Sequence, residues 1–169
     1  MERVDILQQA DIFYELPQEH LEKLAATCHQ ITCEQAGDVI VQQNSLSDEL
    51  YILVQGRVDI VLDPNVEGVE MPDSPDPMVI ATLLPGETFG EIGLVDQGLR
   101  SASARAAVPN TQLLSIKRDD LLRQCQEDYQ LGYLIMRNIA SGLAFKIRNT
   151  DFRVREQLFW KPRPKEGPA

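Results

Sequence analysis

Residues 85–104 read Pro-Gly-Glu-Thr-Phe-Gly-Glu-Ile-Gly-Leu-Val-Asp-Gln-Gly-Leu-Arg-Ser-Ala-Ser-Ala and interrupt an otherwise strand-rich part of the chain. Gly90 and Gly93 allow the backbone to come close to a ligand. The short helical turn after Gly90 offers unpaired N–H groups at its start. The forked guanidinium of Arg100 fits two phosphate oxygens, and Ser101 adds a hydroxyl. The stretch therefore predicts a cradle for a phosphate group.

Glu91 lies within this cradle, where a carboxylate would repel an anion. A carboxylate accepts hydrogen bonds and donates none, so it fits a ligand that also carries a hydroxyl. A small molecule with a phosphate and a ribose hydroxyl is the natural ligand. Taken singly, Arg100 could instead pair with a surface carboxylate, and Glu91 could cap its own helical turn. The ordered set of residues favours ligand binding over these alternatives.

The segments on either side of residues 85–104 contain short runs of branched apolar residues separated by turn signals. Short strands at this spacing predict an all-β barrel, roll or jelly roll rather than a βαβ fold. Four prolines and five acidic residues in 63–77 exclude a helix or central strand there and predict a surface hairpin loop. The predicted strands cover residues 39–41, 50–54, 58–62, 78–81 and 111–116.

Helical periodicity appears at both ends of the chain. Two short helices are predicted over about residues 3–14 and 18–28. A short helix follows residue 117, and a long one with an apolar stripe runs over about 129–158 until prolines end it. The predicted organisation is an N-terminal helical segment 1–30, a β-roll 31–117 with the cassette 86–104, C-terminal helices 118–160 and a flexible tail 161–169.

Composition narrows the classes of function. The 26 acidic and 16 basic residues give a net charge of -10, which argues against a nucleic-acid coat or a binder of anionic lipid. Residues 142–169 nevertheless carry a net charge of +4, which leaves -14 on the rest. Apolar runs are too short to span a bilayer, so no membrane association is expected. Three sparse cysteines favour a reducing cytoplasm and buried thiols over disulfides or a metal site.

The string Phe-Gly-Glu-Ile-Gly-Leu at 89–94, followed by Arg-Ser-Ala-Ser at 100–103, is similar to the phosphate-binding cassette of cyclic-nucleotide-binding domains. Such domains occur in bacterial catabolite activators, protein kinase regulatory subunits and gated channels. The resemblance covers about residues 10–150. It departs at Asn44, where many members have Gly, but Asn tolerates positive φ. Further blocks that resemble the family are Ile12-Phe13 with Leu16, Gly37–Ile40, Leu50–Leu53 and Gly56–Val58.

The resemblance implies an α+β fold: a cyclic-nucleotide-binding β-roll, or double-stranded jelly roll, flanked by short N-terminal helices and a long C-terminal helix. Glu91 would accept a hydrogen bond from the ribose 2′-hydroxyl, and Arg100 would pair with the cyclic phosphate. The long helix would cover the base or form a dimer seam. The implied ligand-binding residues are Phe89, Gly90, Glu91, Ile92, Gly93, Arg100, Ser101 and Ala102.

The residue after Arg100 bears on the choice of nucleotide. Family members with Thr at this position often favour cGMP, and those with Ala favour cAMP. Ser101 is intermediate and resembles bacterial cAMP sensors, so cAMP is expected in preference to cGMP.

We therefore expect a stand-alone cyclic-nucleotide sensor that signals by moving its C-terminal helix against a protein partner or its own dimer mate. The alternative is a vestigial fold that acts as an interaction module without ligand. His20 and His29 lie far from the cassette and no nucleophile–base pair is evident, so neither an enzyme nor a cofactor is expected. About eleven residues follow Leu158, too few for a helix-turn-helix, so no sequence-specific DNA binding by this chain is expected.

Overall fold

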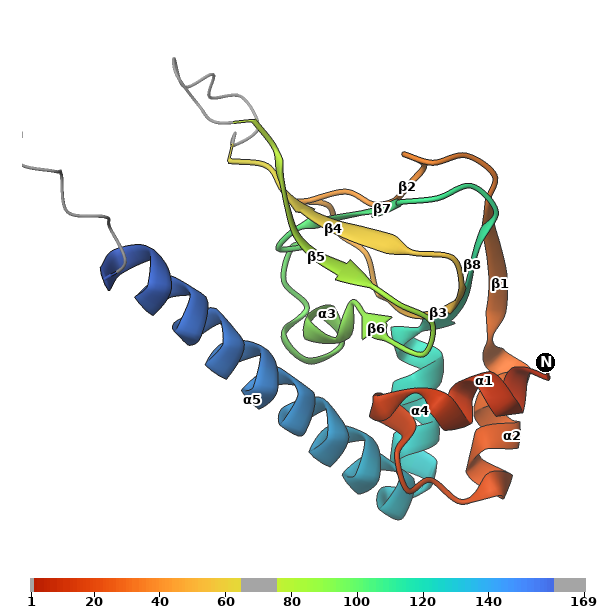
Figure 1. Ribbon diagram of the computed structural model, residues 1–169. Helices are drawn as coiled ribbons and strands as arrows, with labels where there is room; N and C mark the ends of the chain where they lie inside the picture. Colours follow the sequence, from red (N-terminus) through yellow and green to blue (C-terminus); the bar gives the residue numbers. More distant parts are fainter. Residues whose placement is uncertain (1, 65–75, 160–169) are drawn as a thin grey trace, which may run out of the picture.

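The computed structural model describes residues 2–64 and 76–159. It contains two four-stranded antiparallel sheets with helices on one side (Figure 1). The strand orders are β1-β8-β3-β6 and β2-β7-β4-β5. The strands are β1 (His29–Cys33), β2 (Val39–Val41), β3 (Glu49–Gln55), β4 (Val58–Leu62), β5 (Met78–Leu83), β6 (Thr88–Phe89), β7 (Ser103–Ala106) and β8 (Thr111–Lys117). The helices are α1 (Arg3–Gln9), the 3-10 turn η1 (Asp11–Phe13), α2 (Gln18–Thr27), α3 (Glu91–Asp96), α4 (Arg118–Glu127) and α5 (Tyr129–Phe159).

The central strand β3 is apolar along its length because it faces two cores. Leu50 and Ile52 point to the helical layer, where they pack with buried residues of α1, α2, α4 and α5. Tyr51 and Leu53 point the other way and pack between the two sheets. Successive side chains of a strand alternate between its faces, so a strand covered on both faces shows no polar alternation. Burial in two cores thus explains the continuous apolar run at 50–54.

The structure confirms the predicted fold class, a β-roll with short N-terminal helices and a long C-terminal helix. The helix predicted over 3–14 is shorter, because Ala10 is extended (φ -84°, ψ 127°) and separates α1 from η1. Strand β1 begins at His29, inside the segment assigned to helices. The sequence analysis also missed β6 and β7. Strand β7 consists of Ser-Ala-Arg-Ala, which lacks branched residues, and it forms by pairing with β2 and β4.

The predictions for the loops and the C-terminal tail can be compared with the structure only within the described residues. Asn44 adopts a φ of 63°, as predicted for a residue that replaces Gly. Strands β4 and β5 pair antiparallel, so residues 63–77 connect a hairpin as predicted. Residues 65–75 of that connection and the predicted tail 161–169 lie outside the described residues. No helix in the described part of the chain is long and apolar enough to cross a membrane.

The three cysteines are buried and unpaired. Burial raises the pKa of the Cys28 thiol to about 11, and it also raises the pKa values of Cys33 and Cys125. These thiols are therefore protonated near neutral pH and pack as small apolar groups.

Helix α5 starts at a hydrogen-bonded corner and leaves the body of the molecule at its far end (Figure 1). The carboxylate of Asp128 accepts hydrogen bonds from the backbone N–H groups of Gln130 and Leu131, at 3.0 and 3.1 Å. Nε2 of His20, in α2, lies 2.8 Å from the other oxygen of Asp128. The first half of α5 is buried through Leu131, Ile135 and Ile139. The start of α5 is thereby fixed to the N-terminal helices.

Gly56, in the turn between β3 and β4, has a φ of 92°, and a Cβ there would lie 2.5 Å from Oγ1 and 2.9 Å from Cα of Thr111. Gly37 has nearly the same φ, 93°, with nothing within 4 Å of an added Cβ. We expect Gly37→Ala to lower the free energy of unfolding by about 1 kcal/mol through backbone strain alone. Gly56→Ala adds a steric clash and should cost about 3 kcal/mol or more. Urea unfolding measures both variants, and equal losses would contradict the steric argument.

Asp128 provides a test of how α5 is anchored. The backbone N–H of Leu131, and next the hydrogen bond with His20, hold the pKa of Asp128 below its ordinary value of 3.8. A depressed folded-state pKa contributes stability above the unfolded-state pKa and loses it as the pH falls through the folded value. We expect the loss of stability in Asp128→Ala to be largest near neutral pH and to shrink below about pH 4. Denaturant unfolding across this range checks it, with Asp151→Ala, an exposed carboxylate of α5, as the control. A loss that stays constant into acid would exclude the ionised cap.

Candidate functional site

A cavity of about 530 Å³ lies between the sheet β2-β7-β4-β5, the cassette segment (residues 86–104) and α5. All eight residues that the sequence analysis assigned to ligand binding line this cavity. Its other wall comes from strands β4 and β5 and from one face of α5. The lining includes Phe89, Gly90, Glu91, Ile92, Gly93, Arg100, Ser101 and Ala102, together with Val41, Ile60, Ile80, Leu83, Asn138, Phe145, Lys146, Asn149, Thr150 and Arg153.

Arg100 is buried (7% exposed) at one end of the cavity. Its Nη1 donates to the carbonyl oxygen of Gly90 at 3.1 Å. Its Nη2 donates to Oγ of Ser47 at 2.8 Å and to the carbonyl oxygen of Glu49 at 2.6 Å. These acceptors are neutral, and Nε of Arg100 is buried without a hydrogen-bond partner in the described residues. No described carboxylate forms an ion pair with Arg100, so the surface pairing considered from the sequence is not observed there.

A buried cation without a counter-ion carries a large desolvation cost, which an anion bound beside it would offset. The backbone around Arg100 is held in place, because its N–H donates to the carbonyl of Ser45 and its carbonyl accepts from the N–H of Asn44. Its guanidinium carbon also lies 6.0 Å from the ring centroid of Tyr51. Protein groups alone thus fix the position of this charge.

Tyr51, the aromatic neighbour of the guanidinium, stacks on Phe89. Their rings stack with centroids 4.9 Å apart and an interplanar angle of 12°. The hydroxyl of Tyr51 donates to Oε2 of Glu49 at 2.7 Å. Burial first, and then this hydrogen bond, raise the pKa of Tyr51 to about 12. Tyr51 is therefore neutral and acts as a packing platform.

The two cassette glycines leave room for the side chain of Arg100. Gly90 has a φ of 90°, and a Cβ there would lie 2.6 Å from the carbonyl oxygen of Glu49 and 2.7 Å from Nη1 of Arg100. A Cβ on Gly93 would lie 3.4 Å from the same nitrogen. Space at these positions is needed by the guanidinium and its acceptors. The backbone at these glycines therefore approaches Arg100 closely, and the predicted close approach to a ligand stays a prediction.

Glu91 begins the short helix α3 and is also buried (7% exposed). Its Oε1 accepts a hydrogen bond from Nζ of Lys146, in α5, at 2.5 Å. The carboxylate and the Arg100 guanidinium therefore line one cavity without forming an ion pair with each other. This arrangement leaves an anion site at Arg100 and a separate hydrogen-bond acceptor at Glu91.

Ser101 and Ala102 connect Arg100 to β7. Within the described residues, their backbone N–H groups donate to no hydrogen-bond acceptor. Ile92 is half exposed at the rim, whereas Phe89 is buried. Free N–H groups next to a buried guanidinium are the donors that phosphate oxygens require.

The sequence analysis missed the residues that α5 and the second sheet contribute. The polar residues of α5 that face the cavity lie on one helix face, because Lys146 is followed by others at three, four and seven positions and Asn138 precedes it by eight. That polar spacing was the available signal, but only the apolar stripe was used. The opposite wall is apolar and comes from branched residues of separate strands, which no local pattern connects. The α5 residues concerned are Asn138, Lys146, Asn149, Thr150 and Arg153.

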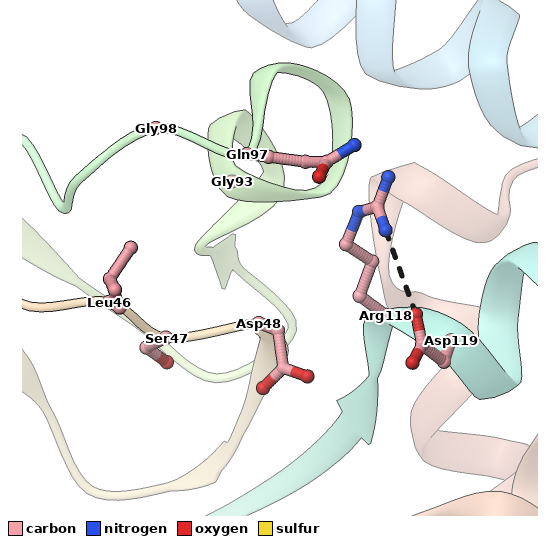
Figure 2. Close-up of a pocket in the computed structure, with 8 residues that line it drawn as sticks. All are labelled: Leu46, Ser47, Asp48, Gly93, Gln97, Gly98, Arg118 and Asp119. Atoms are coloured by element: carbon pink, nitrogen blue, oxygen red, sulfur yellow. Dashed lines mark ion pairs between the residues drawn. The ribbon is translucent and has the colours of Figure 1, made fainter.

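A second cavity, of about 300 Å³, lies behind the cassette and is lined by residues of α3, α4 and the β2–β3 loop (Figure 2). Nε of Arg118 donates to the carbonyl oxygen of Leu94, and its Nη1 lies 3.6 Å from Asp119. The carboxylate of Asp48 also faces this space (Figure 2). Acidic groups here outnumber the basic one, so this cavity is less suited to an anion than the one at Arg100.

The described residues contain no group of three or more His, Cys, Asp or Glu side chains that could hold a metal ion. The chemistry available in the first cavity is recognition by the buried guanidinium of Arg100, the buried carboxylate of Glu91, backbone N–H groups, polar side chains of α5 and an apolar wall.

Comparison with known proteins identifies the family. The family model described as "Cyclic nucleotide-binding domain" matches residues 35–128. The chain is 32% identical over 148 residues to the "Cyclic AMP receptor protein" of Thermus thermophilus, covering 88% of this chain and 62% of that protein. It is 29% identical over 114 residues to the "cAMP-dependent protein kinase regulatory subunit" of Schizosaccharomyces pombe, covering 66% of this chain and 28% of that one. It therefore spans less than two thirds of either relative.

Solved structures agree with the sequence comparison. The crystal structure of the Thermus thermophilus catabolite activator protein superimposes with a TM-score of 0.70 at 30% identity, covering 89% of this chain and 64% of that chain. A cyclic nucleotide-binding domain from Methylobacillus flagellatus gives a TM-score of 0.75 at 20% identity, covering 92% and 82%, and supports the fold alone. No separate DNA-binding module is present in residues 2–64 and 76–159. The chain belongs to the cyclic-nucleotide-binding domain family.

Proposed function

We propose that this protein is a regulatory sensor that binds cAMP in preference to cGMP in the cavity between the cassette and α5. The observation that supports this most strongly is Arg100, a buried guanidinium without a described counter-ion at one end of a ligand-sized cavity. A cyclic phosphate carries one negative charge and two free oxygens. It would neutralise this charge and accept hydrogen bonds from Arg100 and from the N–H groups of Ser101 and Ala102.

The rest of the cavity fits the remainder of a nucleoside. Glu91 offers a carboxylate acceptor for a ribose 2′-hydroxyl, which can donate one hydrogen bond to it. Val41, Ile60 and Leu83 offer an apolar surface on the sheet, and Phe145 faces the cavity from α5. A purine ring placed there would be enclosed by apolar side chains, with polar groups of α5 at its edge.

The preference for cAMP rests on two observations. Ser101 follows Arg100, as in the bacterial cAMP sensors that the cassette resembles. The Thermus and Schizosaccharomyces relatives are named for cyclic AMP, although cGMP-dependent protein kinases also match this chain at 24–28% identity.

Signalling would pass through α5, which is fixed at its start and extends beyond the body of the molecule. One face of α5 lines the cavity, and a different face carries exposed apolar side chains: Tyr133, Met136, Ile147, Val154 and Leu158. The sequence analysis gave covering the base and forming a dimer seam as alternatives for this helix. Because the two faces differ, α5 can close the cavity and contact a second protein surface at the same time.

A binding and regulatory role, without catalysis, fits the family and the groups in the cavity. The alternative role, an interaction module without ligand, uses the same exposed face of α5 but makes no use of Arg100. Ligand titration therefore separates the two.

Calorimetric titration with cAMP, cGMP and 5′-AMP tests the proposed function. We expect the wild type to bind cAMP most tightly and Arg100→Ala to lose at least about 30-fold in affinity, because the phosphate charge then lacks its partner. Arg100→Lys keeps the charge but not the fork and should fall between them. Arg123→Ala, which removes an exposed arginine of α4, should bind like the wild type.

Absence of binding of either cyclic nucleotide to the folded wild type would refute the sensor and leave the interaction module. Tighter binding of cGMP than of cAMP would reverse only the preference for the base. Circular dichroism on each variant establishes that a loss of binding is not a loss of folding.

The exposed face of α5 predicts self-association. Tyr133, Met136, Ile147 and Val154 fall along one seam of a heptad repeat, the spacing at which two helices interdigitate. We expect sedimentation equilibrium to give the mass of two chains for the wild type, and Ile147→Glu or Val154→Glu to reduce it toward one. Ser141→Glu places the same charge elsewhere on α5 and should leave the mass unchanged. A monomeric wild type would instead assign this face to a different protein partner.

A further inference from the structure

We infer that Lys146 is a built-in competitor of the ligand: its ammonium group occupies the Glu91 carboxylate in the empty protein and pins the outer half of α5 to the cassette. A ligand hydroxyl has to displace this ammonium group before it can use the carboxylate. The inference rests on the proposed function, because it assigns regulation to the same cavity.

The ion pair joins segments that have no other direct polar link among the described residues. Nζ of Lys146 lies 2.5 Å from Oε1 of Glu91, and the two residues are 55 positions apart in the chain. The Glu91 side chain is 9% exposed, whereas that of Lys146 is 51% exposed. The carboxylate is therefore a fixed part of the cavity wall, and the lysine is the partner that can withdraw into solvent.

Two other charged side chains of the cavity, Glu87 and Arg153, already have hydrogen-bond partners in the backbone. Oε2 of Glu87 accepts a hydrogen bond from the backbone N–H of Leu84 at 2.6 Å. Arg153 donates to the carbonyl oxygen of Ile80 at 2.7 Å. Glu91 is buried and forms no ion pair with Arg100, so its ionised form needs another partner, and Lys146 supplies it.

The attachment of α5 divides the helix into a fixed and a releasable part. Nδ2 of Asn138 donates to the carbonyl oxygens of Ile12 and Tyr14, at 3.2 and 2.8 Å. Arg137 pairs with Glu15 at 2.8 Å. Beyond residue 142 most side chains of α5 are exposed, and Lys146 and Arg153 provide its polar links to the body. Breaking the Lys146–Glu91 pair therefore removes one of these two links and leaves the anchored part in place.

The thermodynamic consequence is a coupling between ligand affinity and the position of α5. The empty state is stabilised by the ion pair, and the liganded state replaces it with a hydroxyl–carboxylate hydrogen bond. Any stabilisation specific to the empty state lowers the apparent affinity by the same factor. Removing the lysine should therefore tighten binding, and the gain should depend on the ligand hydroxyl that competes for Glu91.

Titration of cAMP and 2′-deoxy-cAMP into wild type, Lys146→Met and Arg148→Met tests this directly. We expect Lys146→Met to bind cAMP roughly three- to tenfold more tightly than the wild type. Its affinity for 2′-deoxy-cAMP should be that of the wild type, because this ligand has no hydroxyl to compete with the lysine. Arg148→Met removes a charge from the same helix outside the cavity and should change neither affinity. Lys146→Arg keeps a cation at this position and should restore the weaker binding of cAMP.

An unchanged cAMP affinity in Lys146→Met would overturn the inference. A weaker affinity would overturn it too, because Lys146 would then act as a contact of the bound phosphate. A gain of equal size for 2′-deoxy-cAMP would also contradict it, since the competition would not be for Glu91.

Hydrogen exchange of the empty protein separates this inference from the proposed function. If the wild type binds no nucleotide, the proposed function fails, yet the link between Lys146 and α5 is still measurable. We expect Lys146→Met and Glu91→Gln each to raise amide exchange in residues 143–156, with no further increase in the double variant. Arg148→Met should behave as the wild type. Unchanged exchange in Lys146→Met would reject the proposed role of the Lys146–Glu91 ion pair, whatever the titrations show.

Discussion

The burial of one guanidinium organises the functional half of this molecule. Arg100 donates to Gly90, Ser47 and Glu49, which belong to the cassette and to the segment that leads into β3. These hydrogen bonds to the two Nη atoms of a buried charge leave the surrounding backbone little freedom. Gly90 and Gly93 lack side chains because the guanidinium and its acceptors fill that space. The conformation of the cassette follows from satisfying Arg100, and its unbalanced charge makes the cavity an anion site.

The second constraint is the path of α5 across the open side of that cavity. The buried first half of α5 belongs to the helical core, and Asp128 and Asn138 fix its direction. The outer half then passes over the cassette, where it completes the cavity and supplies the cation that pairs with Glu91. The same helix presents a separate apolar face to solvent. A single rigid element thus connects the nucleotide cavity to a surface suited to another chain.

How far each feature of the fold and site could be predicted depends on how far apart in the chain its interacting residues lie. The cassette residues are contiguous, and each has a chemical property that is readable locally: a fork of donors, a lone acceptor or a missing side chain. They could therefore be assigned from the sequence, and the structure places all eight around one cavity. Strand β7 could not be assigned, because small residues form a strand there only through pairing with β2 and β4. Lys146 belongs to the basic segment 142–169, and no local pattern connects that segment with Glu91.

The sequence by itself determined the fold class, the family and the residues of the candidate site in the cassette, because these depend on periodicity and on a short ordered motif. Tertiary structure alone decided what surrounds those residues. It showed that the cassette glycines leave room for the Arg100 guanidinium, that α5 lines the cavity with one face and exposes apolar side chains on another, and that Glu91 pairs with Lys146. Each of these depends on contacts between segments tens of residues apart, and the distance and direction of such contacts are set by how the helices and sheets pack, which no local pattern of residues encodes.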